Sequence, residues 1–121
     1  MRKVFVRGIG MVTPLGLNRE ASFTAAVAGK SAIAPAPASI LKWLPNALAA
    51  NVDQGFESLL SKTALGLDRA TQFALAATQE ALLDAGFEAD EKQKSRTGVY
   101  IGIGMGGAAT IDALYTRFFE L

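Results

Sequence analysis

The sequence contains no cysteine and no histidine among its 121 residues. It therefore has no thiolate nucleophile, no imidazole base, no disulfide and none of the commonest protein ligands of zinc. An excess of one charge is also missing, because the net charge is +1. Such a balance creates no field that would draw the chain to nucleic acid or to anionic lipid. We expect no metal site, no cofactor, no nucleic-acid partner and no catalytic residue within these residues.

Long hydrophobic runs are absent as well. The first residues, "MRKVFVRGIG", hold only three apolar side chains before Arg7 interrupts them, which is too short for the core of a signal peptide. No uninterrupted apolar run approaches the roughly 20 residues that cross a bilayer. We expect a soluble, cytoplasmic protein with no membrane partner.

Core-forming residues are plentiful, since 50% of the sequence is hydrophobic. The run at residues 3–6 is β-branched and aromatic, which predicts a strand, and Thr13 and Pro14 predict a turn after it. Asn18 can cap a helix over residues 19–28, and Gly29 can end it. These signals predict a strand, a turn and a helix in that order.

The middle of the chain is irregular. Residues 30–62 hold three of the four prolines and show no sustained period, which predicts a long excursion with one short helical piece at residues 56–60. Order returns with a helix capped by Asp68 and ended by Gly86. Ala70, Phe73, Ala74, Ala77 and Ala81 make one face of this helix, and its alanines allow close approach.

The last third predicts a second strand and a final helix. Residues 97–104, "TGVYIGIG", form a continuous apolar run of the kind buried in parallel sheets. After it, Ile111, Leu114, Tyr115 and Phe118 share one face of an amphipathic helix. The order predicts a right-handed crossover between two parallel strands, with sheet edges and helix faces left open. We therefore expect part of a larger α/β structure.

Glycines follow the second predicted strand at a suggestive spacing. Gly102, Gly104 and Gly107 match the fingerprint of a dinucleotide-binding turn. That function also needs an acidic residue about 20 positions later, beyond the given sequence. The alternative is a turn that brings the strand end close to another backbone, and the residues alone leave both interpretations open.

Several stretches together resemble the start of β-ketoacyl-acyl-carrier-protein synthases. They are "VFVRGIGMVTPLG", "AVAGKSAI", "LDRATQFALAATQEALLDAG" and "TGVYIGIGMGG", in the order and approximate spacing of that family. The resemblance implies a thiolase-like layered α/β/α fold built from two similar halves, and a homodimer. Residues 1–121 would supply the N-terminal part of the first half, so the fold is incomplete in this chain and no complete second half is present.

The resemblance also implies a reaction. In the family, a cysteine takes an acyl group from an acyl carrier protein, and two histidines assist the decarboxylation of a malonyl thioester. Because this sequence contains neither residue type, we expect the chain alone to be inactive and to be a piece of a longer or split protein. The alternative is a non-catalytic partner subunit or interaction module of the same lineage.

The glycine turn receives a role from the same resemblance. The residue that matches Met105 acts in the family as a gate of the acyl pocket. Gly104, Gly106 and Gly107 belong to a backbone turn at the pocket and at the dimer interface. The resemblance favours this role over nucleotide binding. Met105 could instead be an ordinary filler of the core, and both interpretations predict that it is buried.

Other polar and aromatic residues carry less information. Glu80 and Asp84 are four residues apart on the predicted helix and could pass for a catalytic pair, but a solvated helix face is the simpler interpretation. Asp68 is expected to be a helix cap, with Arg69 as a neighbouring surface cation. Trp43 could anchor a partner or pin its loop to the core, and its role stays open.

Overall fold

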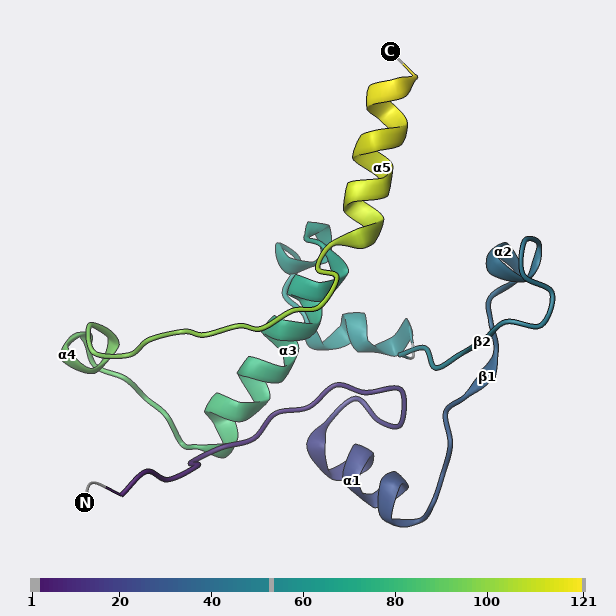
Figure 1. Cartoon of the computed structure of the whole chain (residues 1–121). Coiled ribbons are helices and arrows are strands. Elements are labelled where there is room, and N and C mark those ends of the chain that lie inside the picture. Colours follow the sequence, from purple (N-terminus) through teal and green to yellow (C-terminus); the bar gives the residue numbers. More distant parts are fainter. Residues whose placement is uncertain (1–2, 53, 121) are drawn as a thin grey trace.

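The computed structural model describes residues 3–52 and 54–120 (Figure 1). Helix α3 (Arg69–Asp84) lies at the centre, and the other segments extend from it or pass across it. The remaining helices are α1 (Arg19–Val27), α2 (Ala38–Leu41), α4 (Glu91–Lys94), α5 (Ala108–Phe119) and the 3-10 helices η1 (Gln54–Leu59) and η2 (Ala64–Gly66). Strands β1 (Ala34–Pro35) and β2 (Leu48–Ala49) form a short ribbon away from α3.

The ends of the two predicted central helices are confirmed. The side chain of Asn18 accepts a hydrogen bond from the Ala21 amide at the start of α1, and Asp68 accepts one from the Ala70 amide at the start of α3. Gly29 and Gly86 directly follow the C-cap residues of these helices and have φ angles of 66° and 55°. These are the side-chain caps and left-handed glycines that commonly bound helices.

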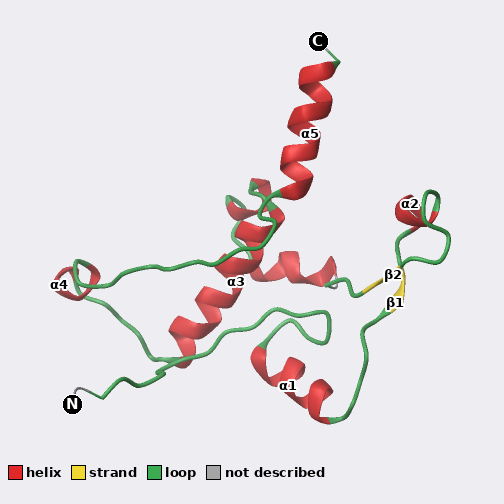
Figure 2. Cartoon of the chain, in the orientation of Figure 1, coloured by secondary structure: helices red, strands yellow, loops and turns green. Residues whose placement is uncertain are grey.

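The two predicted strands are wrong for this structure. Residues 3–6 and 97–104 are extended, but neither segment pairs with a neighbour (Figure 2). In the described part of the chain, the sheet is the antiparallel pair of β1 and β2, with Ala34 opposite Ala49. The expected parallel pair, its crossover and the α/β/α layers are therefore not formed among the described residues.

The physical reason is that a strand exists only through hydrogen bonds to a neighbouring strand. The N-terminal segment crosses the C-terminal half of α3, whereas residues 101–103 lie along its N-terminal half. The two segments are thus separated along the helix and cannot bond to each other. Val4 is 94% exposed and Tyr100 is 95% exposed, so the described chain also covers neither of them.

The N-terminal segment approaches α3 very closely. A Cβ atom added to Gly10 would lie 1.8 Å from the carbonyl oxygen of Ala77, and one added to Gly8 would lie 2.1 Å from that of Ala81. No side chain fits in such a space. The small face predicted for α3 is confirmed at Ala77 and Ala81, where glycine backbone lies directly on the helix.

The core is small. Phe56, from η1, is fully buried, and its ring centroid lies 4.8 Å from that of Phe73 on α3. The other buried apolar residues are alanines: Ala25, Ala36, Ala64 and Ala76. The apolar face of α5 is exposed, as the sequence predicted, with Phe118 71% exposed. Among the described residues, no helix is long and apolar enough to span a membrane.

Candidate functional site

The glycine turn at residues 104–107 connects the extended segment to α5. Gly106 has a φ of 58°, a left-handed conformation that favours glycine, and Gly107 is the N-cap residue of α5. A Cβ atom on Gly102 or Gly104 would meet no other atom within 4 Å. Within this turn, the positions that require glycine are therefore Gly106 and Gly107.

Met105 lies at the outside of this turn. Its residue surface is 84% exposed, so the expectation that it is buried is wrong for the described chain. Its apolar neighbours Ile101 and Ile103 are also largely exposed. The described residues provide no wall that would cover the methionine.

Asp68 joins the start of α3 to the start of α5. One carboxylate oxygen accepts the Ala70 amide at 2.9 Å, and the other accepts the Thr110 hydroxyl at 2.6 Å. A Cβ atom on Gly107 would lie 2.8 Å from the second oxygen. The Thr110 hydroxyl, followed by the Ala70 amide, lowers the pKa of Asp68, since both donate to the charged form.

This arrangement disfavours a phosphate cradle. In dinucleotide-binding turns, the N-terminus of the following helix faces a phosphate. Here the Asp68 carboxylate lies against the first turn of α5, at Gly107 and Thr110. A second anion at the same place would be repelled. Gly107 is therefore better explained by its close approach to Asp68 than by a phosphate site.

A pocket of about 410 Å³ lies between the N-terminal half of α3 and residues 101–107. Its lining is mostly apolar, including Ala74 on α3 and Ile101, Ile103 and Ile111 on the other side. Its polar lining residues are Asp68, Thr71 and Thr110, of which Asp68 and Thr110 are hydrogen-bonded to each other. The pocket thus contains apolar surface and one hydrogen-bonded carboxylate.

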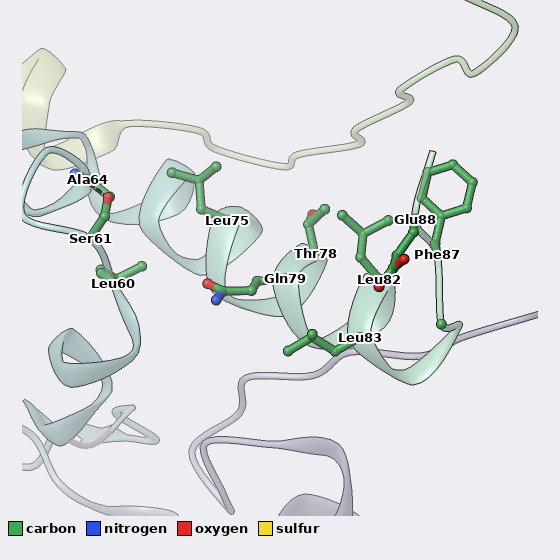
Figure 3. A pocket seen from close by; sticks show the side chains of 11 residues that line it. Leu60, Ser61, Ala64, Leu75, Thr78, Gln79, Leu82, Leu83, Phe87 and Glu88 are labelled. Carbon is green, nitrogen blue, oxygen red and sulfur yellow. Dashed lines mark hydrogen bonds between the residues drawn. The ribbon is translucent and has the colours of Figure 1, made fainter. Parts of the chain in front are cut away.

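A second pocket, of about 500 Å³, lies along the C-terminal half of α3 (Figure 3). Leu75, Leu82 and Phe87 give it apolar walls, and the polar groups around it include Thr78 and Glu88. In the described chain, no three acidic residues come together in a way that could hold a metal ion. In the first pocket the Asp68 carboxylate and the Thr110 hydroxyl are hydrogen-bonded to each other, and this pair joins the starts of α3 and α5.

Glu80 is half-buried and Asp84 is exposed, so their helix face is partly solvated, but both carboxylates also bind backbone amides, which the sequence did not predict. The two oxygens of Glu80 accept the backbone amides of Met11 at 2.8 Å and Arg19 at 2.9 Å. Asp84 accepts the Ile9 amide at 3.0 Å and the Arg19 guanidinium at 2.6 Å. These carboxylates attach the N-terminal segment and α1 to α3.

Arg69 is also more than a surface cation. Its guanidinium carbon lies 4.6 Å from the centroid of the Phe56 ring and 5.1 Å from that of Phe73. It also pairs with Glu57 at 3.3 Å. Cation–π contact and the ion pair fix η1 against α3. By contrast, Trp43 is 78% exposed and is not pinned to the core.

The comparison with known proteins decides the family. Residues 1–118 match the family described as "Beta-ketoacyl synthase, N-terminal domain". The chain belongs to this family. Membership in the β-ketoacyl synthase family implies a thiolase-like fold, of which the described structure shows a helix-rich part with a small sheet.

Curated relatives of this β-ketoacyl synthase domain agree with the match. The chain is 34% identical to 3-oxoacyl-acyl-carrier-protein synthase 2 of Coxiella burnetii, over 94% of this chain and 28% of that protein. It is 36% identical to the protein of the same name from Rhizobium meliloti, over 96% of this chain and 30% of the relative.

A further relative carries a polyketide name. The putative polyketide beta-ketoacyl synthase 2 of Streptomyces coelicolor is 36% identical, over 88% of this chain and 26% of that protein. The chain therefore spans less than a third of the length of the curated relatives it matches.

Two features of this synthase domain were missed by the sequence reasoning. The bond from Thr110 to Asp68 joins residues 42 positions apart, and no local pattern predicts such a contact. Gln72 is buried and donates from its amide to the carbonyls of Ala64, Leu65 and Leu67. The available signal for Gln72 was a polar residue among the alanines and Phe73 at the start of the predicted helix.

Proposed function

We propose that this chain forms the N-terminal part of the first thiolase-like half of a β-ketoacyl-acyl-carrier-protein synthase. The synthase would condense an acyl thioester with a malonyl thioester in fatty-acid or polyketide synthesis. The observation that carries the proposal is the family match across residues 1–118. The names of the relatives from Coxiella, Rhizobium and Streptomyces support it.

The proposed reaction is a decarboxylative Claisen condensation. A cysteine thiolate attacks the acyl thioester, takes the acyl group and releases the thiol of the carrier protein. The malonyl thioester then loses carbon dioxide, and the resulting carbanion attacks the acyl carbonyl and releases the cysteine thiolate. The chain contains no cysteine and no histidine for these steps. The chain alone is thus proposed to be inactive. It would contribute part of the acyl-pocket wall and part of the fold that supports it.

Within the assembled synthase, Met105 is proposed to act as the gate of the acyl pocket. Gly104, Gly106 and Gly107 would form the backbone turn at the pocket and at the dimer interface. The exposed position of Met105 and the left-handed Gly106 are compatible with a mobile side chain on a fixed turn. Residues 3–6 and 97–104 would then join a sheet in the layered fold.

The proposed partners follow from the same reaction. They are an acyl carrier protein, the acyl and malonyl thioesters, and a second synthase subunit that forms a homodimer or a mixed pair. The exposed aromatic side chains of α5, Tyr115, Phe118 and Phe119, offer apolar surface for such an assembly. We place the protein in the cytoplasm, where carrier-protein chemistry would occur.

A second candidate is a non-catalytic partner subunit that shapes the pocket of another synthase. The lack of cysteine and histidine in these residues keeps this candidate open. The test is to incubate the natural protein that carries this chain with acyl and malonyl thioesters of a carrier protein. Release of carbon dioxide with formation of a β-ketoacyl product supports the synthase, and no product without an added subunit supports the partner.

A further inference from the structure

The start of α5 is attached to α3 through one polar contact. The Thr110 hydroxyl donates to the second carboxylate oxygen of Asp68 at 2.6 Å. Between the described residues, this is the one hydrogen bond that joins residues 98–120 to the preceding part of the chain. The other hydrogen bonds of α5 are within its own turns. The placement of the glycine turn relative to α3 therefore depends strongly on Asp68.

One more hydrogen bond holds the Asp68 carboxylate in place, and Gly107 leaves room for it. Its first oxygen accepts the Ala70 amide at 2.9 Å, which fixes the side chain on α3. Its second oxygen lies where a Cβ atom on Gly107 would come within 2.8 Å. The carboxylate is thus fixed to α3 on one side and lies against the turn on the other.

Apolar packing adds little to this attachment. Ile101 and Ile103 are 65% and 68% exposed, and Met105 is 84% exposed. Ile101 and Ile103 line the pocket between residues 101–107 and α3, so they face the helix across open space. A loose apolar contact permits several orientations, whereas a short bond to a charged oxygen selects one.

We propose that Asp68, acting through Thr110, is a positioning residue that holds the glycine turn and Met105 at a fixed place relative to α3. In the assembled synthase this position would set how strictly long acyl chains are excluded. The inference rests on the proposed gate function of Met105. The proposed role of Asp68 is exerted through Thr110 and assigns the carboxylate no part in the chemical steps.

The decisive variant separates this role from the capping of α3. Thr110→Val removes the hydroxyl but keeps a β-branched side chain of the same shape, and the bond from Ala70 to Asp68 remains. Thr116→Val is the matched control, because Thr116 lies on the same helix and its hydroxyl bonds to no other described residue. Asp68→Ala removes both bonds, and Asp68→Asn keeps an oxygen that can accept one.

The first experiment measures the placement directly. Nitroxide labels are placed on Gln79→Cys and Arg117→Cys, two exposed positions on α3 and α5, in the natural protein that carries this chain. Cysteines outside residues 1–121 are replaced by serine, which makes the labels selective because residues 1–121 contain no cysteine of their own. Labelled protein is diluted with unlabelled protein, so that only distances within one chain are recorded. We expect Thr110→Val and Asp68→Ala to broaden and shift the distance distribution, and Asp68→Asn to restore it in part. A distribution that Thr110→Val leaves equal to that of Thr116→Val overturns the positioning role.

The second experiment measures selectivity in the natural synthase that carries these residues. Mutations that alter a coupled position typically change an equilibrium by about two- to thirty-fold. We expect Thr110→Val to raise the ratio of long-chain to short-chain acyl loading by a factor in this range, in the same direction as Met105→Ala. Thr116→Val should leave the ratio unchanged.

The two failures are distinguishable. If Met105→Ala changes the ratio but Thr110→Val does not, Asp68 and Thr110 have no part in selectivity, and the inference is overturned. If Met105→Ala itself leaves the ratio unchanged, the gate function fails, and the selectivity half of the inference fails with it. The distance measurement reports on the positioning half in either case.

Discussion

Gly10 lies where the N-terminal segment crosses α3, and no side chain fits between the two backbones. The Ala77 carbonyl oxygen would be 1.8 Å from an added Cβ atom, and backbone of α3 cannot move aside as a flexible side chain would. The contact explains why glycine stands in a stretch that otherwise has the composition of a strand. It also makes a single methyl group an informative probe.

Gly10→Ala should loosen the N-terminal segment from α3. Overpacking of this kind costs about 1–3 kcal/mol, which corresponds to amide exchange in the C-terminal half of α3 that is about 5- to 150-fold faster. The measurement is hydrogen exchange of the α3 amides in the chain. Gly66→Ala is the matched control, because an added Cβ atom there meets nothing within 4 Å. Equal amide exchange in Gly10→Ala and Gly66→Ala would show that the N-terminal segment does not lie closely on α3.

Met105 is expected to control acyl-chain length in the natural synthase. Met105→Phe should fill the acyl channel and reduce the loading of long acyl groups far more than that of short ones, and Met105→Ala should relax the discrimination. Each buried methylene is worth about 0.8 kcal/mol, so losing room for three or four costs roughly 2–3 kcal/mol, on the order of a hundredfold.

Acyl loading rates over a series of chain lengths test the gate. The same substitutions at Met11, which lies away from the turn beside α3, are the matched control. A uniform loss at all chain lengths for the Met105 variants would assign this residue to structural packing instead.

At the scale of elements, α3 organises the structure through its carboxylates. Glu80 holds the Met11 and Arg19 amides, Asp84 holds the Ile9 amide and the Arg19 guanidinium, and Asp68 holds the start of α5. Each carboxylate satisfies donors on a segment distant in sequence. The helix is thus the common support of the N-terminal segment, α1 and the glycine turn.

Glu80→Gln should weaken this support. The glutamine side chain keeps one acceptor oxygen and turns an NH₂ group toward a backbone amide that also donates. Losing a hydrogen bond to a charged group costs about 1.5 kcal/mol at the low end, so we expect roughly tenfold faster exchange of the Met11 and Arg19 amides. Glu88→Gln is the control, since Glu88 is exposed and holds no amide. Unchanged exchange of both amides in Glu80→Gln would contradict the role of this carboxylate.

The helices and their ends could be predicted from the sequence because their signals are local. Asn18 and Asp68 cap helices whose C-terminal ends lie next to Gly29 and Gly86, and the spacing of apolar residues predicts α5. The sequence did not predict α4, a single turn closed by a capping box at Asp90. Such a short helix shows no periodicity.

Contacts between distant segments could not be predicted in the same way. The strands at residues 3–6 and 97–104 need a neighbouring strand, and the sequence pattern does not say whether one is present. Likewise, a solvated face and a face that binds backbone amides have the same composition, so Glu80 and Asp84 gave no local signal. The turn itself was predicted, but its contact with Asp68 was not.

At the scale of the whole molecule, exposed apolar surface dominates. The residues that are exposed include Phe118 and Phe119 on α5, Tyr100 in the extended segment and Val4 near the N-terminus. Large apolar side chains left exposed in this way favour association with another surface. Unpaired extended segments add hydrogen-bonding groups that can pair with another chain.

We expect the chain on its own to associate. Sedimentation velocity should show species larger than the monomer, with proportions that depend on concentration, and heating should give no single cooperative transition. A monodisperse monomer with a cooperative melt would mean that these residues close their own core.

The central claim is that these residues are the N-terminal part of a condensing enzyme whose acyl-accepting thiolate lies elsewhere. The direct measurement is mass analysis of the natural protein after incubation with an acyl thioester, followed by peptide mapping. We predict one acyl group per chain, on a cysteine outside residues 1–121, and none within them, because no thiolate is available there. An acyl adduct on a residue within 1–121, or a natural protein that accepts no acyl group at all, would contradict this account.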